Sequence, residues 1–285
     1  MSIVTISRGC FSHGKDIARK TAELLGYGCV SREILIDASR YFDVSEKKIL
    51  TALHDAPGML DKFTHGTDEY LCYAKAALIE NVRKDNVVYH GYGGHLLLPD
   101  IPHILKIRII SDFDTRVAYT MEKERLSYAE ATRRIKKEDE HRKTWTRTVF
   151  GKNLEDPFLY DAVLNIGDMD IDDAARVIAD LAQSDSFKTT AESQKKLDDY
   201  AIHCHAAASL YRLQISNARI RVNDATVMIY IPPRRIRKTA HMTPRIEQDF
   251  AENEKRAVNH AVKEEIKKIP GVHEVYCSFD EPFVH

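Results

Sequence analysis

The sequence has no long apolar run and few cysteines. No apolar stretch reaches the roughly 18 residues that a membrane-spanning helix requires, and the opening Met-Ser-Ile-Val lacks the basic start of a secretion signal. We therefore expect a soluble cytoplasmic protein with no membrane span. The five cysteines are scattered and include no Cys-x-x-Cys pair, which argues against a disulfide framework and against a structural zinc site.

An excess of charge of one sign is also absent, since the formal net charge is −1 at pH 7. No broad basic face for duplex nucleic acid is expected, so nucleic acid is not a predicted partner. A polar segment without apolar periodicity, QSDSFKTTAESQKK, follows residue 182. We expect a first domain over 1–183, a linker over 184–196 and a second domain over 197–285.

The first domain alternates short apolar runs with helical periods. Five runs read as strands: 2–7, 26–30, 86–93, 103–111 and 160–166. Between or after them, helical periods cover 14–25, 32–41, 68–84, 112–148 (with a break near Ser127) and 171–183. Strands that alternate with helices favour an α/β fold with a mainly parallel, five-stranded sheet covered on both faces.

The second domain reads as a small α+β unit. A helix over about 191–213 precedes two adjacent strands, and a long helix over about 247–268 precedes a last strand at 273–279. Asn223-Asp224 lies between the two adjacent strands and fits a tight hairpin turn.

The stretch VTISRGCFSHGKDIARK joins the first strand to the first helix. Gly9 and Gly14 have the spacing of a phosphate-binding loop, and Lys15 follows directly. Such a loop points backbone N–H groups and a lysine at an anion, whereas an ordinary strand–helix turn with two glycines is the alternative. Asp16 stands where these loops place a Ser or Thr that ligates Mg²⁺. Its carboxylate is a candidate Mg²⁺ ligand, although it also repels phosphate.

With these motifs in view, the first 182 or so residues resemble the cytidylate-kinase-like branch of the P-loop nucleoside monophosphate kinases. Four segments carry the resemblance: the opening strand with Arg8 and SHGKDIARKTAELLG, then VVYHGYGGHLLLPDIPHILKIRIISDFDTRV, YAEATRRIKKEDEHRKTW and FGKNLEDPFLYDAVLNIGDMDIDDAARVI. The resemblance implies a P-loop kinase that uses ATP and Mg²⁺ to phosphorylate a CMP-like nucleoside monophosphate or a related small acceptor.

The same resemblance implies roles for particular residues. ATP is expected at Gly9, Ser12, His13, Gly14, Lys15 and Asp16, and the acceptor nucleotide at Arg32, Tyr92, Arg134 and Asp161. Lys15, Asp139 and Arg142 are the expected catalytic residues. The last two interrupt an apolar stripe on the helix that begins after Ser127, which favours a site. Because they are three residues apart, the alternative is that they simply pair with each other.

Departures from the family pattern leave a second function open. Tyr92 stands in a turn where cytidylate kinases carry an arginine, and Phe11 and His13 stand where that branch has glycines. The alternative is therefore a non-catalytic nucleotide sensor that regulates the second domain. A kinase of another small metabolite is a further alternative.

Other features carry weaker expectations. His203-Cys204-His205 lies on a predicted helix, where residues two apart point to different sides, so a metal site is not expected. The basic segment 232–245 is either solvated surface or a ligand- or partner-binding loop. The second domain resembles, loosely and through KKIPGVHEV, a BON-like module that binds a ligand or protein partner, and a homo-oligomer remains open.

Overall fold

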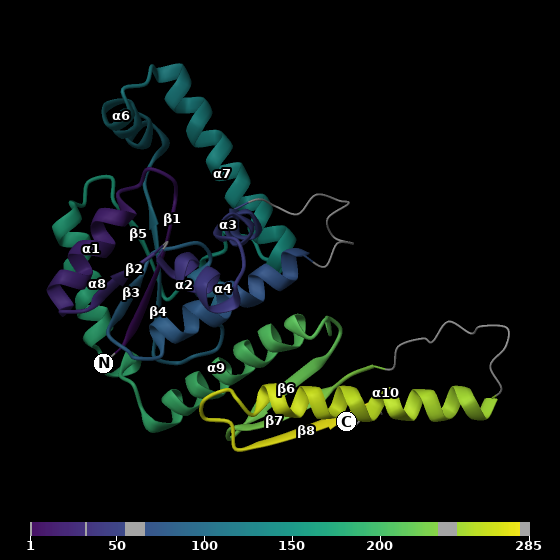
Figure 1. Ribbon diagram of the computed structural model, residues 1–285. Helices are drawn as coiled ribbons and strands as arrows, with labels where there is room; N and C mark the ends of the chain where they lie inside the picture. The colour runs from purple at the N-terminus through teal and green to yellow at the C-terminus, as the bar shows by residue number, and fades with distance from the viewer. Residues whose placement is uncertain (1, 32, 55–65, 233–243, 280–285) are drawn as a thin grey trace. The chain divides into compact units, whose positions relative to one another are not determined.

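The computed structural model describes residues 2–31, 33–54, 66–232 and 244–279 (Figure 1). The chain divides into two compact units, Met1–Gln194 and Lys195–His285. Each unit is described by itself below. In the described residues, no helix is long and apolar enough to cross a membrane.

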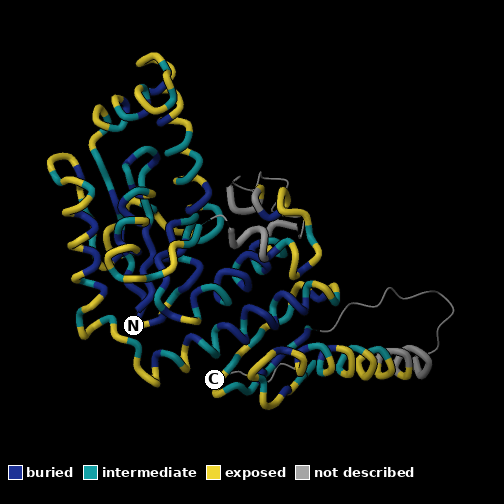
Figure 2. The backbone as a smooth tube through the Cα atoms, turned by 60° about the vertical axis from the view of Figure 1, so that its left-hand side comes forward, coloured by how far each residue is buried: buried dark blue, intermediate teal, exposed yellow. Residues whose placement is uncertain are grey.

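The first unit contains a five-stranded, all-parallel sheet in the order β2-β3-β1-β4-β5. The strands are β1 (Ile3–Arg8), β2 (Gly28–Val30), β3 (Val87–Tyr89), β4 (Ile104–Ile110) and β5 (Ala162–Asn165). Because β1 lies in the middle of the sheet, its apolar residues Ile3, Val4 and Ile6 are almost fully buried. Figure 2 shows that buried stretches of the first unit lie mainly in its interior and that its outer helices carry many of the exposed ones. The predicted α/β fold is confirmed.

Helices cover both faces of this sheet (Figure 1). The helices of the unit are α1 (Gly14–Leu25), α2 (Glu33–Phe42), α3 (Glu46–His54), α4 (Gly66–Val82), α5 (Gly94–Leu97), α6 (Phe113–Glu124), α7 (Tyr128–Phe150) and α8 (Ile171–Gln183), with short 3-10 turns η2 (Pro157–Leu159) and η3 (Asp185–Phe187). Helices α1 and α8 pack on one face through a shared apolar cluster, in which Ile17 and Ile178 meet the strand residues Val4 and Leu105. Helix α3 was not predicted from the sequence.

The break predicted near Ser127 separates α6 from α7. Ser127 caps α7, because its hydroxyl accepts from the backbone N–H of Glu130 while the Glu130 carboxylate accepts from the backbone N–H of Ser127. This reciprocal capping fixes where the long helix α7, called the lid helix below, begins. Buried residues of α7, Ala131, Ile135 and Trp145, then face the rest of the unit.

The second unit holds the smaller, three-stranded sheet, in the order β6-β7-β8, and is an α+β arrangement as predicted. Its elements are α9 (Ala191–Arg212, which begins before residue 195), β6 (Arg219–Asn223), β7 (Thr226–Tyr230), α10 (Pro244–Ile266) and β8 (Glu274–Ser278). The hairpin turn lies one residue later than expected. Asp224 and Ala225 are its central residues, both at positive φ, and Asn223 still pairs with Thr226. The Asp199 carboxylate accepts from both turn N–H groups and so holds this turn.

Candidate active site

The loop between β1 and α1 is held by one hydrogen bond to strand β4 and by one within the loop. The backbone N–H of Gly9 donates to the carbonyl of Ile109 on β4 at 3.1 Å, and the fully buried Ser12 hydroxyl donates to the Gly9 carbonyl at 2.9 Å. The Ser12 hydroxyl is therefore occupied inside the loop. Gly9 and Ser12 shape the loop and do not border its open side.

Two residues of this loop adopt a backbone conformation that favours glycine. Phe11 and His13 both have φ of 54°, in the left-handed region that costs a residue with a Cβ about 1–2 kcal/mol. They are the two positions at which the sequence departs from the glycines of the resembled family. The loop has kept the glycine conformation without the glycines.

His13 stands at the head of α1 without capping it. Its side chain accepts no hydrogen bond from the helix, so it does not occupy the first amides of α1, which are the groups that bind anions at a helix start. Its ring instead packs on Tyr119 of α6, with ring centroids 3.9 Å apart, and its Nδ1 lies 3.9 Å from the Asp16 carboxylate. His13 thus flanks the N-terminal end of α1.

Gly14 is required by a close approach of Arg8. A Cβ at position 14 would lie 2.5 Å from the Arg8 Cδ atom, well inside contact distance. The next residue, Lys15, is exposed and makes no ion pair with any described residue. The loop therefore presents one available ammonium at the start of α1.

Asp16 lies in the first turn of α1, partly exposed, 4.0 Å from the Arg19 guanidinium. Its carboxylate borders the same cleft as Lys15. A partly exposed carboxylate at this place is suited to hold Mg²⁺ beside phosphate oxygens, because Mg²⁺ prefers oxygen ligands and keeps several waters. Among the described residues, no group of three or more His, Cys, Asp or Glu side chains is arranged to hold a metal ion by itself.

Asp139 joins the lid helix to the loop rather than facing the cleft. Its Oδ2 accepts from Arg116 Nη1 at 2.7 Å, and its Oδ1 accepts from the Cys10 thiol at 3.0 Å. Burial, followed by the hydrogen bond to Asp139, raises the pKa of Cys10 to about 12. Both carboxylate oxygens are therefore engaged, and Asp139 holds the loop in place.

Arg142 takes a different partner, three residues along the same helix. Its Nη1 donates to the backbone carbonyl of Arg8 at 2.8 Å, and its guanidinium lies 5.2 Å from the ring centroid of Tyr92. The Tyr92 ring also meets Trp145 edge-on, with centroids 6.3 Å apart. Burial and the charge of Arg142 lower the pKa of Arg8. In the described structure, Asp139 and Arg142 thus have separate partners and do not serve as a pair.

The turn after β3 brings Tyr92 to this point because its glycines allow it. A Cβ on Gly91 would lie 2.1 Å from the Tyr89 hydroxyl, and one on Gly94 would lie 2.4 Å from the Tyr89 ring. Gly93 has φ of 58° and lies against Trp145. The turn is therefore packed tightly on Tyr89 below and on the lid helix beside it.

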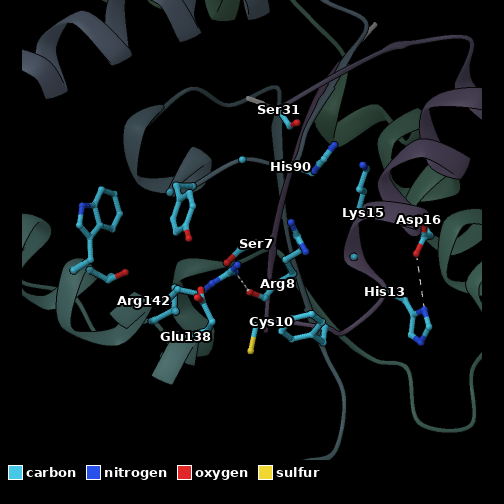
Figure 3. A pocket seen from close by; sticks show the side chains of 18 of the residues that line it. Ser7, Arg8, Cys10, His13, Lys15, Asp16, Ser31, His90, Glu138 and Arg142 are labelled. Atoms are coloured by element: carbon cyan, nitrogen blue, oxygen red, sulfur yellow. Dashed lines mark hydrogen bonds and ion pairs between the residues drawn. The ribbon is translucent and has the colours of Figure 1, made fainter. Parts of the chain in front are cut away.

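These elements enclose a cleft of about 470 Å³ (Figure 3). Lys15, Asp16 and His13 border it on one side and Arg142 and Glu138 on the other. More lining side chains carry positive than negative charge: Arg8, Lys15, Lys123, Arg134 and Arg142 against Asp16 and Glu138. The excess of positive charge and the open helix start suit a ligand with several phosphate groups.

The residues predicted from the sequence lie in four places. The cleft is bordered by His13, Gly14, Lys15, Asp16, Tyr92, Arg134 and Arg142. Gly9, Ser12 and Asp139 support the loop. Asp161 lies outside the cleft, where its carboxylate accepts from the backbone N–H of Lys106 at 2.7 Å and aligns β5 with β4. Arg32 lies outside the described residues, as does most of the basic segment 232–245.

Sequence reasoning missed several residues of the cleft. It used Arg8 only as part of a motif and did not single out Lys123 or His95, although all three border the cleft. Arg8 was detectable, because the last residue of a parallel strand lies at the sheet edge where ligands bind. Lys123 follows Tyr119 by four residues on α6, so a shared helix face was the available signal.

Comparison with known proteins decides the family. The profile of the cytidylate kinase-like family matches residues 3–168, which is more than half of the chain. The chain belongs to this family. Family and fold together support a nucleotide kinase-like function, and the family resemblance read from the sequence is confirmed.

Two solved structures are similar to this family member. The crystal structure of an uncharacterized protein from Eubacterium ventriosum is 22% identical, with a TM-score of 0.51, and the match covers 65% of this chain and 99% of that one. A shikimate kinase from Acinetobacter baumannii in complex with shikimate is 13% identical, with a TM-score of 0.36, and the match covers 66% of this chain and 96% of that one. None of the curated proteins matches.

Proposed function

We propose that the first unit binds ATP with Mg²⁺ and transfers the γ-phosphoryl group to a nucleoside monophosphate, CMP or a related small acceptor. One observation carries this proposal: the exposed Lys15 at the head of α1 and Arg142 of the lid helix border the same cleft as the turn after β3. Phosphoryl transfer requires mainly that the two substrates are positioned and that the charge of their phosphates is neutralised. The cations that border this cleft can serve both purposes.

The acceptor phosphate needs cations, and the turn itself offers none. In place of an arginine it carries Tyr92, whose ring lies under the guanidinium of Arg142. Arg8, which is partly buried and makes no salt bridge in the described structure, lies next to Arg142. We assign the missing cationic role to these two guanidinium groups, because an anion between or beside two adjacent, partly buried cations relieves their repulsion.

The reaction balances without a catalytic base. An oxygen of the acceptor phosphate forms a bond to the γ-phosphorus, the bond from that phosphorus to the β–γ bridging oxygen breaks, and ADP leaves with the electron pair. A phosphomonoester dianion carries no proton to remove at neutral pH. This agrees with Asp139, both of whose carboxylate oxygens are engaged by Arg116 and Cys10. Mg²⁺ held by Asp16 would neutralise charge on the ATP phosphates.

The test is ADP release from the full chain with ATP and each of the nucleoside monophosphates, with and without Mg²⁺. A kinase releases ADP with at least one acceptor, and only when Mg²⁺ is present. Asp16→Asn should then weaken the dependence on Mg²⁺, whereas Asp173→Asn, which changes an exposed carboxylate on α8, should not. ADP release that ignores both the acceptor and the metal would refute the proposal.

A second candidate is the non-catalytic nucleotide sensor. Phe11 and His13 favour it, because their side chains occupy a loop whose backbone is built for glycine. A sensor binds ATP with little dependence on Mg²⁺ and releases no ADP with any acceptor. ATP binding measured by calorimetry beside the ADP assay separates the two functions.

A further inference from the structure

His95 borders the cleft from a buried position. It is the second residue of α5 and is 4% exposed. Neither Nδ1 nor Nε2 of its ring has a hydrogen-bond partner among the described residues. Buried polar atoms without a partner are rare and lower the stability of the folded state, so each one requires an explanation.

The surroundings of His95 keep its ring uncharged. Burial, followed by the charges of Arg108 and Lys106, lowers its pKa to about 3. On one side its ring packs against Tyr160, with centroids 4.7 Å apart, and the Tyr160 hydroxyl accepts from Arg108 Nη1 at 3.3 Å. At neutral pH His95 therefore offers one N–H donor and one nitrogen lone pair in an electropositive environment.

The protein backbone cannot easily move to satisfy these atoms. The helix start that carries His95 is packed on the Tyr89 ring through Gly94, and Gly93 lies against Trp145. The described side chains leave both nitrogens unpaired, and His95 lines the cleft, so a ligand bound there can supply the missing partner. Both nitrogens are closed to solvent, so such a ligand reaches them only when neighbouring side chains shift.

We infer that His95 is a specificity-determining residue that donates a hydrogen bond to an uncharged carbonyl oxygen of the acceptor. The inference rests on the proposed function, because it assigns a part of the same acceptor site. The positive charges of Arg108 and Lys106 favour an oxygen with partial negative charge near the ring. A neutral imidazole does not compensate a full phosphate charge, which falls to Arg8 and Arg142. The exocyclic carbonyl oxygen of a pyrimidine base fits this description.

The experiment compares two ligands that share a phosphate and differ in the base. Calorimetry with the full chain measures CMP and ribose 5-phosphate, with ATP titrated separately. The native chain should bind CMP about tenfold more tightly than ribose 5-phosphate, the value of roughly one net hydrogen bond. His95→Leu should abolish that preference, leave ATP affinity unchanged and melt at the same or a higher temperature, because it removes two unpaired polar atoms.

Two further variants control for structural effects. His95→Gln keeps an N–H donor and should retain part of the preference for CMP. His103→Gln changes another buried histidine, which is 0% exposed, faces Asp85 at 4.0 Å and lies outside the cleft. This variant is expected to change the melting temperature without changing the preference for CMP.

The outcomes separate this inference from the kinase proposal. Equal affinity of the native chain for the two ligands, or an unchanged preference in His95→Leu, overturns the role of His95 even if ADP is released. A preference that depends on His95 in a chain that releases no ADP supports the inference and refutes the kinase. Absence of CMP binding with ATP binding intact overturns the inference as well.

Discussion

The thiol of Cys10 donates a hydrogen bond to the carboxylate of Asp139 across 3.0 Å, and so joins the phosphate loop to the lid helix α7. Arg116 completes the arrangement with a bond to the other carboxylate oxygen. Asp139, which was expected to act in catalysis, thus anchors the loop to α7, and Cys10 is a buried hydrogen-bond donor to it.

This arrangement predicts that Cys10 is unreactive. Its pKa of about 12, raised mainly by burial, leaves the thiol protonated and therefore weakly nucleophilic at any pH below that value. Alkylation with iodoacetamide at pH 8, followed by mass spectrometry, should modify the exposed Cys29 well before Cys10. Modification of Cys10 at the rate of Cys29 in the folded chain would contradict the prediction.

Replacing Lys15 by alanine should weaken ATP binding by about 1–3 kcal/mol, the value of a charged hydrogen bond. The melting temperature should stay the same, because Lys15 is exposed and makes no ion pair with the described residues. Calorimetric titration with ATP measures the effect. Lys188→Ala removes an equal charge that pairs with Asp185, and its ATP affinity should equal that of the native chain.

Arg142→Ala should lower kcat/KM about 100-fold or more, as expected when a cation that stabilises the transferred phosphate is removed. The melting temperature should fall little, since the substitution removes one hydrogen bond, from the guanidinium to the Arg8 carbonyl, and one contact with the Tyr92 ring, while it relieves the repulsion between Arg142 and Arg8. Arg147→Ala serves as the control, because Arg147 is exposed on the same helix. A large fall in stability with full activity per folded molecule would show that Arg142 is structural.

Gly14→Ala should destabilise the first unit by about 1–3 kcal/mol, because the new methyl group meets the Arg8 side chain at 2.5 Å. Urea unfolding of the full chain measures this free energy. Gly28→Ala is the matched control, since its nearest neighbour would be 3.9 Å away. Equal unfolding curves for the two variants would mean that Arg8 moves aside without cost.

The fold was predictable where apolar periodicity is strong. The buried strand β1 and the amphipathic helices α1 and α8 follow directly from their sequence patterns, and Ser127 with Glu130 has the spacing of a helix cap. Helix α3 was missed because a short helix of mixed composition has a sequence pattern that resembles that of a loop. The hairpin turn was predicted one residue too early, at Asn223-Asp224, because Ala225 has a positive φ, which is not expected of an alanine.

The site was less predictable, because its contacts join distant parts of the chain. The sequence singled out Lys15 and Arg142 as catalytic residues; the structure places both at one cleft, and their role in catalysis stays a prediction. Asp161 illustrates the limit. Its neighbour Tyr160 and the family motif suggested a role in substrate binding, whereas its carboxylate bonds to the Lys106 backbone. The backbone amide that the Asp161 carboxylate reaches depends on the register of β5 against β4, and a local motif does not determine that register.

The contact of Tyr89 with Gly91 and Gly94 restricts how this cleft can diverge among related proteins. A side chain at either glycine would collide with the Tyr89 ring, so a change there requires a simultaneous change at position 89. The Tyr89 hydroxyl donates to the backbone carbonyl of Tyr92 at 3.2 Å, a bond that does not involve the Tyr92 side chain, and the side chains of Tyr92 and His95 both border the cleft. New acceptor preferences are therefore most accessible by single substitution at Tyr92 or His95, and an alignment of relatives should show the glycines varying only together with Tyr89.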